Sequence, residues 1–183
     1  MSEYRRYFLP GGTFFFTQVT QFRVPILGDD RARNILGDIF RECQQKYPFE
    51  VVAIVLLPDH LHTIWSLPRG DQQYALRWSW IKSQFTRRWL IAGGTETSIS
   101  KAKREDGRRG VWQRRYWEHT IRCEEDLIHH ANYIHYNPVK HGYVSSPETW
   151  LWSSFHRYVS AGEYEASWGS RGEPLGLPQE VGE

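Results

Sequence analysis

Residues 49–66, FEVVAIVLLPDHLHTIWS, predict two β-strands joined by a tight turn. The continuous apolar run at 49–57 is typical of a strand that is covered on both faces of its sheet. Pro58 and Asp59 turn the chain, and residues 60–66 alternate in character as a strand does. The second strand is therefore expected to run antiparallel to the first, and this hairpin anchors the prediction of the fold.

The segments on either side of this hairpin predict an α+β fold. Apolar periodicity, helix-capping aspartates and the positions of proline and glycine indicate the other elements. In chain order we expect a strand at 13–21, a helix at 29–46, strands at 49–57 and 60–66, a helix at 71–90, a strand within 111–122 and a helix at 124–138. The order β-α-β-β-α-β-α favours a ferredoxin-like α+β sandwich, in which helices cover one face of an antiparallel sheet.

Length and composition indicate one domain. The 183 residues are 40% hydrophobic and 24% charged, which is ordinary for one globular core. Residues 1–160 are expected to form that domain, and residues 161–183, with five Glu against Arg171, a loosely ordered acidic tail. Cys43 and Cys123 show no metal-binding spacing and are expected to be free thiols. Because neither an apolar leader nor a membrane-spanning run is evident, we expect a cytoplasmic protein with no membrane partner.

The charge is unevenly distributed, although the net charge is only +2. Residues 101–115 hold seven Lys or Arg against two acids, and residues 92–110 are expected to be a flexible loop. A basic stretch and nine tryptophans suit a nucleic-acid partner, because phosphates bind cations and bases stack on aromatic rings. The candidate DNA contacts are two clusters in which arginines lie beside aromatic residues: Tyr4, Arg5 and Arg6, and Arg114, Arg115 and Trp117.

His60 and His62 predict one half of a metal site. Side chains two residues apart on a strand share a face, so the two imidazoles lie side by side while Leu61 turns to the opposite face. Paired histidines are a natural start for a divalent-metal site, although the pattern also occurs by chance. A small zinc hydrolase is disfavoured, because the third and fourth soft ligands are missing.

Tyr133 and Asn137 supply a candidate nucleophile and a third ligand. Residues four apart on a helix lie about 40° apart around its axis. The Asn137 carbonyl oxygen suits a hard metal, and a metal that polarises a phosphate helps the Tyr133 phenol to attack it and form a covalent phosphodiester. The alternative is that Tyr133 is an ordinary packed residue. Tyr136 is a competing nucleophile, but it lies about 100° from Asn137.

Four further histidines of this region share no single helix face. They are expected not to form a ligand cluster: His129, His130, His135 and His141.

These motifs resemble those of the REP-associated tyrosine transposases, within the IS200/IS605-like branch of the HUH single-strand nucleases. His60-Leu61-His62 is similar to the His-hydrophobic-His motif, and Tyr133 with Asn137 is similar to the single-tyrosine motif. The matching segments are YRRYFLPGGTFFFTQVT (4–20), LLPDHLHTIW (56–65), WQRRYWEHTIRCEEDL (112–127), YIHYNPVKHGYV (133–144) and WLWSSFHRYV (150–159). The loop at 92–110 and the tail do not carry the resemblance.

The resemblance implies an HUH catalytic domain that acts on single-stranded DNA bearing a palindromic REP hairpin. Tyr133 would attack to leave a 5′-phosphotyrosine and a free 3′-hydroxyl. His60, His62 and Asn137 would hold Mg²⁺ or Mn²⁺, with no nucleotide cofactor. Relatives often use Gln or His as the third ligand, and Asn137 is shorter, so weak metal binding completed by DNA is expected. The alternative function is a non-catalytic ferredoxin-like module that binds single-stranded DNA or RNA, which does not need the three ligands to converge.

Overall fold

The computed structural model describes residues 12–170, 172, 174 and 176–178, so the predicted contacts Tyr4, Arg5 and Arg6 lie outside the described residues. The strands are β1 (Thr13–Val19), β2 (Glu50–Leu56), β3 (His60–Ser66) and β4 (Trp117–Thr120). The α-helices are α2 (Asp30–Lys46), α3 (Tyr74–Ile91), α4 (Lys101–Glu105), α5 (Glu124–Lys140) and α6 (Phe155–Ser160). Short 3-10 turns occupy Gln21–Arg23, Ile26–Gly28 and Pro147–Thr149. Within this described part of the chain, no helix combines the length and apolar character needed to cross a bilayer.

The four strands form one antiparallel sheet in the order β2-β3-β1-β4. The predicted hairpin is confirmed as β2 and β3, in which Leu56 pairs with Leu61. On its other side β3 pairs with β1, and this register sets Thr17 opposite His62. Among the described residues, β4 forms the far edge of the sheet and pairs with β1 alone.

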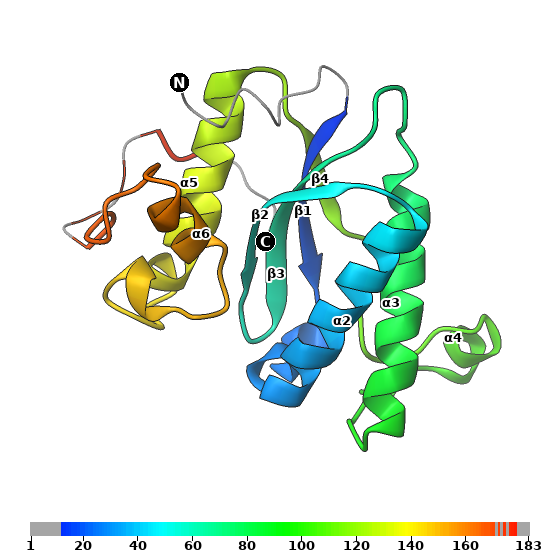
Figure 1. The fold of residues 1–183 in the computed structure, drawn as a ribbon. Helices are drawn as coiled ribbons and strands as arrows, with labels where there is room; N and C mark the ends of the chain where they lie inside the picture. The colour runs from blue at the N-terminus through cyan, green and yellow to red at the C-terminus, as the bar shows by residue number, and fades with distance from the viewer. Residues whose placement is uncertain (1–11, 171, 173, 175, 179–183) are drawn as a thin grey trace.

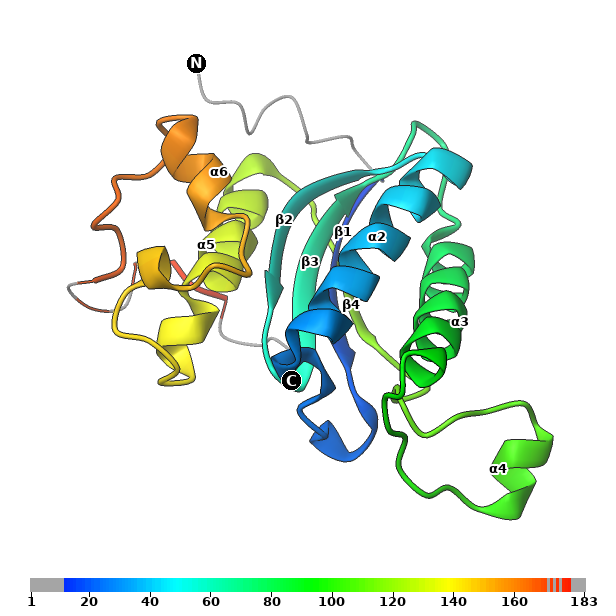
Figure 2. The same ribbon diagram turned by 60° about the horizontal axis from the view of Figure 1, so that its bottom comes forward.

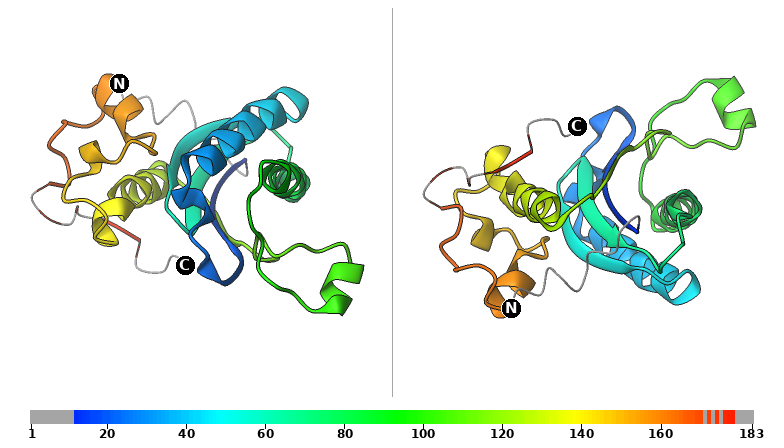
Figure 3. Two further views of the ribbon diagram at one scale, coloured as in Figure 1. Left: turned by 90° about the horizontal axis from the view of Figure 1, so that it is seen from below. Right: turned by 90° about the horizontal axis from the view of Figure 1, so that it is seen from above.

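Helices cover both faces of this sheet (Figure 1). Phe14 and Phe16 of β1 are buried in the core that contains α2 and α3, whereas Phe15 is buried in a second core with α5. Along the sheet, α2 and α3 lie on one side, and α5 and α6 lie on the other (Figure 3). The predicted α+β sandwich with an antiparallel sheet is confirmed, but the prediction that helices cover one face is wrong. β1 and β3 are buried at every position, and such strands must be covered twice.

α5 extends beyond its predicted end at Pro138. Proline costs the helix one backbone hydrogen bond, yet the helix continues to Lys140. It closes in a Schellman motif, in which the Tyr143 N–H donates to the Pro138 carbonyl at 3.0 Å. Gly142 makes this ending possible, because its φ of +71° is costly for any residue with a side chain. This extension by two residues places Lys140, and the C-cap residue His141 after it, at the candidate site.

Two other elements differ from their predictions. The stretch expected to be a loop at 92–110 contains the short helix α4, which projects beyond α3 away from the sheet (Figure 2). α3 begins at Tyr74 rather than at Asp71, because the Asp71 carboxylate accepts from the N–H of Gln73 and pairs with Arg77.

Candidate active site

His60 and His62 lie on the face of the sheet that α5 covers. Their ring centroids are 4.9 Å apart, and both side chains are fully buried. Leu61 between them is buried in the opposite core, with α2 and α3. The alternation of β3 therefore sets both imidazoles on one face, as predicted.

Asp59 orients the His60 ring. Asp59 Oδ1 lies 2.6 Å from His60 Nδ1, and Asp59 Oδ2 accepts from Arg23 Nη1 at 2.9 Å. Burial alone would raise the pKa of the Asp59 carboxyl, but the hydrogen bonds from His60 and Arg23 outweigh it and hold this pKa at about 2. A carboxylate can only accept, so His60 Nδ1 carries a hydrogen, and in the neutral ring Nε2 keeps its lone pair. His60 Nε2 is buried and has no hydrogen-bond partner among the described residues.

Thr17 orients the His62 ring in the same way. Its Oγ1 lies 2.9 Å from His62 Nδ1, across the register of β1 and β3. The His62 ring also contacts Tyr133 of α5, with ring centroids 5.3 Å apart. A partner that holds one ring nitrogen fixes the direction of the other, which is the usual support of a metal-binding histidine.

α5 presents Tyr133, Asn137 and His141 as one stripe, since each residue follows the last by one helical turn. Tyr133 contacts His62, and at the other end of the stripe His141 contacts His60 at 5.2 Å between ring centroids. Asn137 therefore lies between the contact of Tyr133 with His62 and the contact of His141 with His60. Its side chain is fully buried, and neither its oxygen nor its nitrogen has a hydrogen-bond partner within the described chain. A buried amide without partners costs about 1–3 kcal/mol, so these atoms suit a ligand.

Lys140 is a site residue that the sequence analysis missed. Its Nζ donates to the Tyr133 hydroxyl at 3.1 Å and lies 4.7 Å from the centre of that ring. The signal was present, because Lys140 follows Tyr133 by seven residues, or about two helical turns. Because the helix was predicted to end at Pro138, Lys140 was not expected to lie on it. Asp59 was also missed, although it adjoins His60.

Tyr136, the competing nucleophile, packs elsewhere. A Cβ built on Gly169 would come within 3.3 Å of the Tyr136 ring and 3.1 Å of Pro147. Tyr136 therefore lies against the segment around residue 169, whereas Tyr133 contacts His62. This geometry favours Tyr133 over Tyr136 as the residue that shares a site with the histidines.

A second cluster joins β4 to α5. His119, Asp126 and His130 bring ligand atoms within 4.8 Å of one another, so they could hold a metal ion, and His130 thus belongs to a cluster that its helix spacing did not predict. The Asp126 carboxylate lies 2.9 Å from both His119 Nε2 and His130 Nδ1. His130 Nδ1 also lies 2.8 Å from the Asp126 carbonyl, so this nitrogen carries a hydrogen. These hydrogen bonds fasten β4 to α5.

Of the predicted DNA contacts, the structure describes Arg114, Arg115 and Trp117. Arg114 and Arg115 are exposed on the segment that leads into β4. Trp117 is half-buried, with its ring stacked on His119 at 5.9 Å and edge-on to Phe15 at 5.6 Å. Trp117 therefore packs beside the cluster of His119, Asp126 and His130.

Comparisons of the chain with protein families and with known proteins agree with one another. The family described as "Transposase IS200 like" matches residues 13–137. A REP-associated tyrosine transposase of Escherichia coli is 40% identical over 168 residues, covering 92% of this chain and 91% of the relative. A Haemophilus influenzae protein assigned to the same class is 44% identical over 176 residues, covering 92% and 94% of the two chains.

The fold has a solved counterpart. A REP-associated tyrosine transposase whose structure was determined bound to a REP hairpin superposes with a TM-score of 0.71, at 37% identity and over 100% of both chains. At this identity and coverage, the similarity extends to the whole arrangement of sheet and helices.

Proposed function

The chain belongs to the IS200-like transposase family and, within it, to the REP-associated tyrosine transposases, so we propose that it cleaves and rejoins single-stranded DNA at a REP hairpin with Tyr133 as nucleophile. The observation that carries the proposal is the convergence of His60 and His62 with Tyr133 and Asn137. A non-catalytic binding module has no need for this convergence, and a buried amide without partners would only destabilise it.

In the proposed cleavage step, the Tyr133 oxygen attacks the scissile phosphorus while the bond to the 3′ oxygen breaks. The tyrosine loses its proton, and the leaving 3′ oxygen gains one. The products are a 5′-phosphotyrosine and a free 3′-hydroxyl, and the reverse attack by a 3′-hydroxyl rejoins the strand without an external energy source. Lys140 holds the Tyr133 oxygen and stabilises the negative charge that it carries during the attack.

His60, His62 and Asn137 are the proposed ligands of a divalent ion, Mg²⁺ or Mn²⁺. They fit such an ion, because His60 Nε2 keeps its lone pair and the Asn137 oxygen is buried without a partner in the described chain. When bound, the ion supplies positive charge to the phosphoryl oxygens. Two neutral imidazoles and one amide carry no negative charge, so we expect weak affinity until the DNA phosphate completes the site.

Covalent trapping tests the nucleophile. Incubating the protein with Mg²⁺ and a labelled single strand that carries a REP hairpin should give a protein–DNA adduct that survives SDS. Tyr133→Phe should abolish the adduct and leave DNA affinity within about twofold, because only one oxygen is removed. EDTA should prevent the adduct without lowering the unfolding temperature, because the two apolar cores hold the fold.

Tyr136→Phe is the matched control, because it removes the same atom from a neighbouring residue of α5. This variant should form the adduct at the parent rate. If Tyr136→Phe loses the adduct and Tyr133→Phe keeps it, the nucleophile is misassigned. Tight hairpin binding with no adduct in either Mg²⁺ or Mn²⁺ would favour the binding module.

A further inference from the structure

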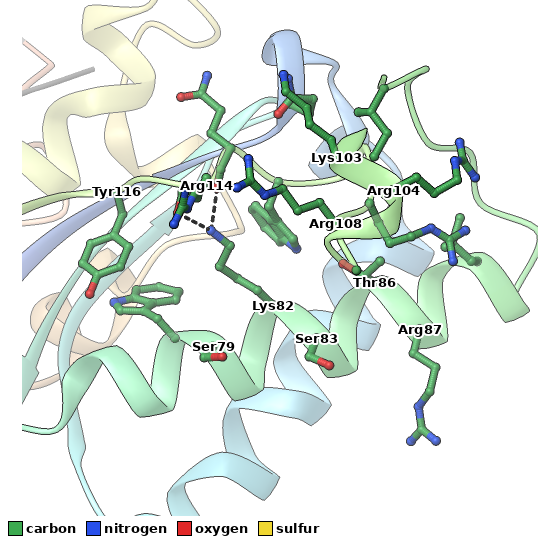
Figure 4. Close-up of a pocket in the computed structure, with 18 of the residues that line it drawn as sticks. Ser79, Lys82, Ser83, Thr86, Arg87, Lys103, Arg104, Arg108, Arg114 and Tyr116 are labelled. Carbon is green, nitrogen blue, oxygen red and sulfur yellow. Dashed lines mark hydrogen bonds between the residues drawn. The ribbon is translucent and has the colours of Figure 1, made fainter. Parts of the chain in front are cut away.

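A basic groove lies on the side of the sheet opposite to Tyr133. It has a volume of about 1040 Å³ and runs between α3, α4 and the segment before β4 (Figure 4). None of the residues that line it is acidic, and seven are cationic: Lys82, Arg87, Lys103, Arg104, Arg108, Arg109 and Arg114. The groove therefore offers a concentrated positive surface in a chain whose net charge is only +2.

Part of this charge is not neutralised by the protein. Arg104 and Arg109 pair with Glu96, and Arg108 pairs with Asp106 at 3.4 Å. Among the described residues, Lys103 and Arg114 make no ion pair, and both are exposed (Figure 4). These two cations come from opposite walls, α4 and the segment before β4, so an anion in the groove is approached from both sides.

Lys82 forms the floor of the groove and shapes one wall. Its Nζ donates to the Gln113 carbonyl at 2.5 Å and to the Arg114 carbonyl at 3.2 Å (Figure 4). These bonds fasten the segment before β4 to α3 and so set the position of Arg114. Burial lowers the pKa of Lys82 to about 8, which means that a nearby anion would stabilise its charged form.

The aromatic residues of the groove favour a duplex over a single strand. Trp78 and Trp112 line it, but they are only 1% and 7% exposed and pack into the core of α2 and α3. Tyr116, the third aromatic residue of the lining, is half-buried against the same core. Single-strand binding sites stack bases on open aromatic faces, whereas duplex sites contact the phosphate backbone with cations. The groove has cationic walls and buried indole rings, so it matches the pattern of a duplex site.

We propose that this groove binds the phosphate backbone of the double-stranded stem of the DNA substrate. The inference rests on the proposed function, because it takes a hairpin as the substrate. Residues 111–120 lead directly from the groove to the edge strand β4 and on to α5, so a stem held here would present its single-stranded flank around that edge toward Tyr133. Most of the outer wall comes from residues 92–110.

Binding measurements on the full chain with Tyr133→Phe test the groove without interference from cleavage. Three labelled probes are compared by fluorescence anisotropy over a range of salt: the hairpin with its flank, the stem duplex alone, and an unstructured single strand. Lys103→Gln/Arg114→Gln should weaken binding of the first two by roughly tenfold and reduce the magnitude of their salt slope by about 2, because two phosphate contacts are lost. Single-strand affinity should stay unchanged.

Arg41→Gln/Arg69→Gln is the matched control, since it removes the same charge from exposed positions outside the groove. It should bind all three probes like the parent, and both double variants should keep the parent's unfolding temperature. Parental affinity and salt slope in the groove variant would overturn the proposal, and so would a loss confined to the single strand. Adduct formation is measured separately, on protein that keeps Tyr133. Failure of the groove proposal and failure of the proposed transposase function therefore give different results.

Discussion

At the scale of single residues, the candidate site depends on partners that hold each functional group in one orientation. Asp59 and Thr17 each engage one imidazole at Nδ1, and the paired rings then meet the stripe on α5. Lys140 does the same for the Tyr133 hydroxyl. Such supporting contacts set the geometry and the charge state of the groups that they touch.

Replacing Lys140 should slow the chemical step and leave binding intact. In Lys140→Gln, the single-turnover rate of adduct formation should fall by about tenfold to a hundredfold, because a positive charge beside the attacking oxygen is lost. DNA affinity should stay within about threefold. Rapid-quench assays from pH 7 to 9 measure the rate, and the variant should gain more from rising pH than the parent does, since hydroxide then assists the deprotonation that Lys140 favours.

Lys140→Arg is the control for charge alone, and it should recover a substantial part of the rate. Equal loss in Lys140→Arg and Lys140→Gln, with the same pH profile as the parent, would mean that Lys140 only packs against the ring.

At the scale of elements, buried and half-buried histidines fasten α5 to its neighbours. His119 and His130 join β4 to α5 through Asp126. His135 is fully buried, and its Nε2 lies 2.8 Å from Ser154 Oγ, at the start of α6. Burial lowers the pKa of His135 to about 3, so the ring is neutral at pH 7.

The neutral His135 makes stability depend on pH. The unfolded chain binds a proton at this ring near pH 6.5, whereas the folded protein binds it only near pH 3, so protons favour unfolding between these values. The stability is fully present above about pH 6.5 and falls with decreasing pH by up to about 1.4 kcal/mol per pH unit. Urea unfolding at pH 7, 6, 5 and 4 measures this slope.

His135→Gln keeps a hydrogen-bonding side chain but cannot titrate. It should be less stable than the parent at pH 7 and should lose less stability on acidification. Parallel pH profiles for the two proteins would assign the acid sensitivity to other groups, among which His130 also has a pKa lowered by burial.

At the scale of the whole molecule, the sheet separates two functional faces. α5 lies on one side of the sheet, and α2 and α3 lie on the other (Figure 3). The candidate catalytic groups belong to the first side, and the basic groove along α3 belongs to the second. The predicted boundary at residue 160 stays a prediction, but the described contacts continue beyond it. The Tyr164 ring stacks on Trp168 at 4.5 Å and on Tyr158 at 5.4 Å, and its hydroxyl donates to Asn132 Oδ1 at 2.7 Å.

Two truncations separate the contribution of the stacked rings of the tail from that of the residues after them. Ending the chain after Gly162 removes Tyr164 and Trp168 from α5 and α6, and it should cost about 2–4 kcal/mol of the free energy of unfolding. Ending it after Ser170 keeps both rings but removes Leu177, which packs against the core beneath α5, and should cost less than the first truncation does. Urea titrations at pH 7 provide the comparison, and equal stability of the two shortened chains would show that the stacked rings add nothing to the fold.

Much of the fold and half of the site follow from local pattern. The alternation of residues 60–66 sufficed to put His60 and His62 on one face, and the helical spacing sufficed to align Tyr133 with Asn137. These are properties of single elements, because a strand repeats every two residues and a helix every 3.6. The four strands and the helices α2, α3 and α5 were predictable for the same reason, whereas α4 and α6 were not predicted.

Only the tertiary structure decided which face of the sheet α5 covers, and with it whether the histidines and Tyr133 meet. The supporting contacts are also tertiary: Thr17 reaches His62 across 45 positions of sequence, and Arg23 reaches Asp59 across 36. The groove depends on Lys82 binding carbonyls 31 and 32 positions away. Periodicity describes one element at a time, whereas these pairings are set by how a strand register and two packed faces bring distant segments together.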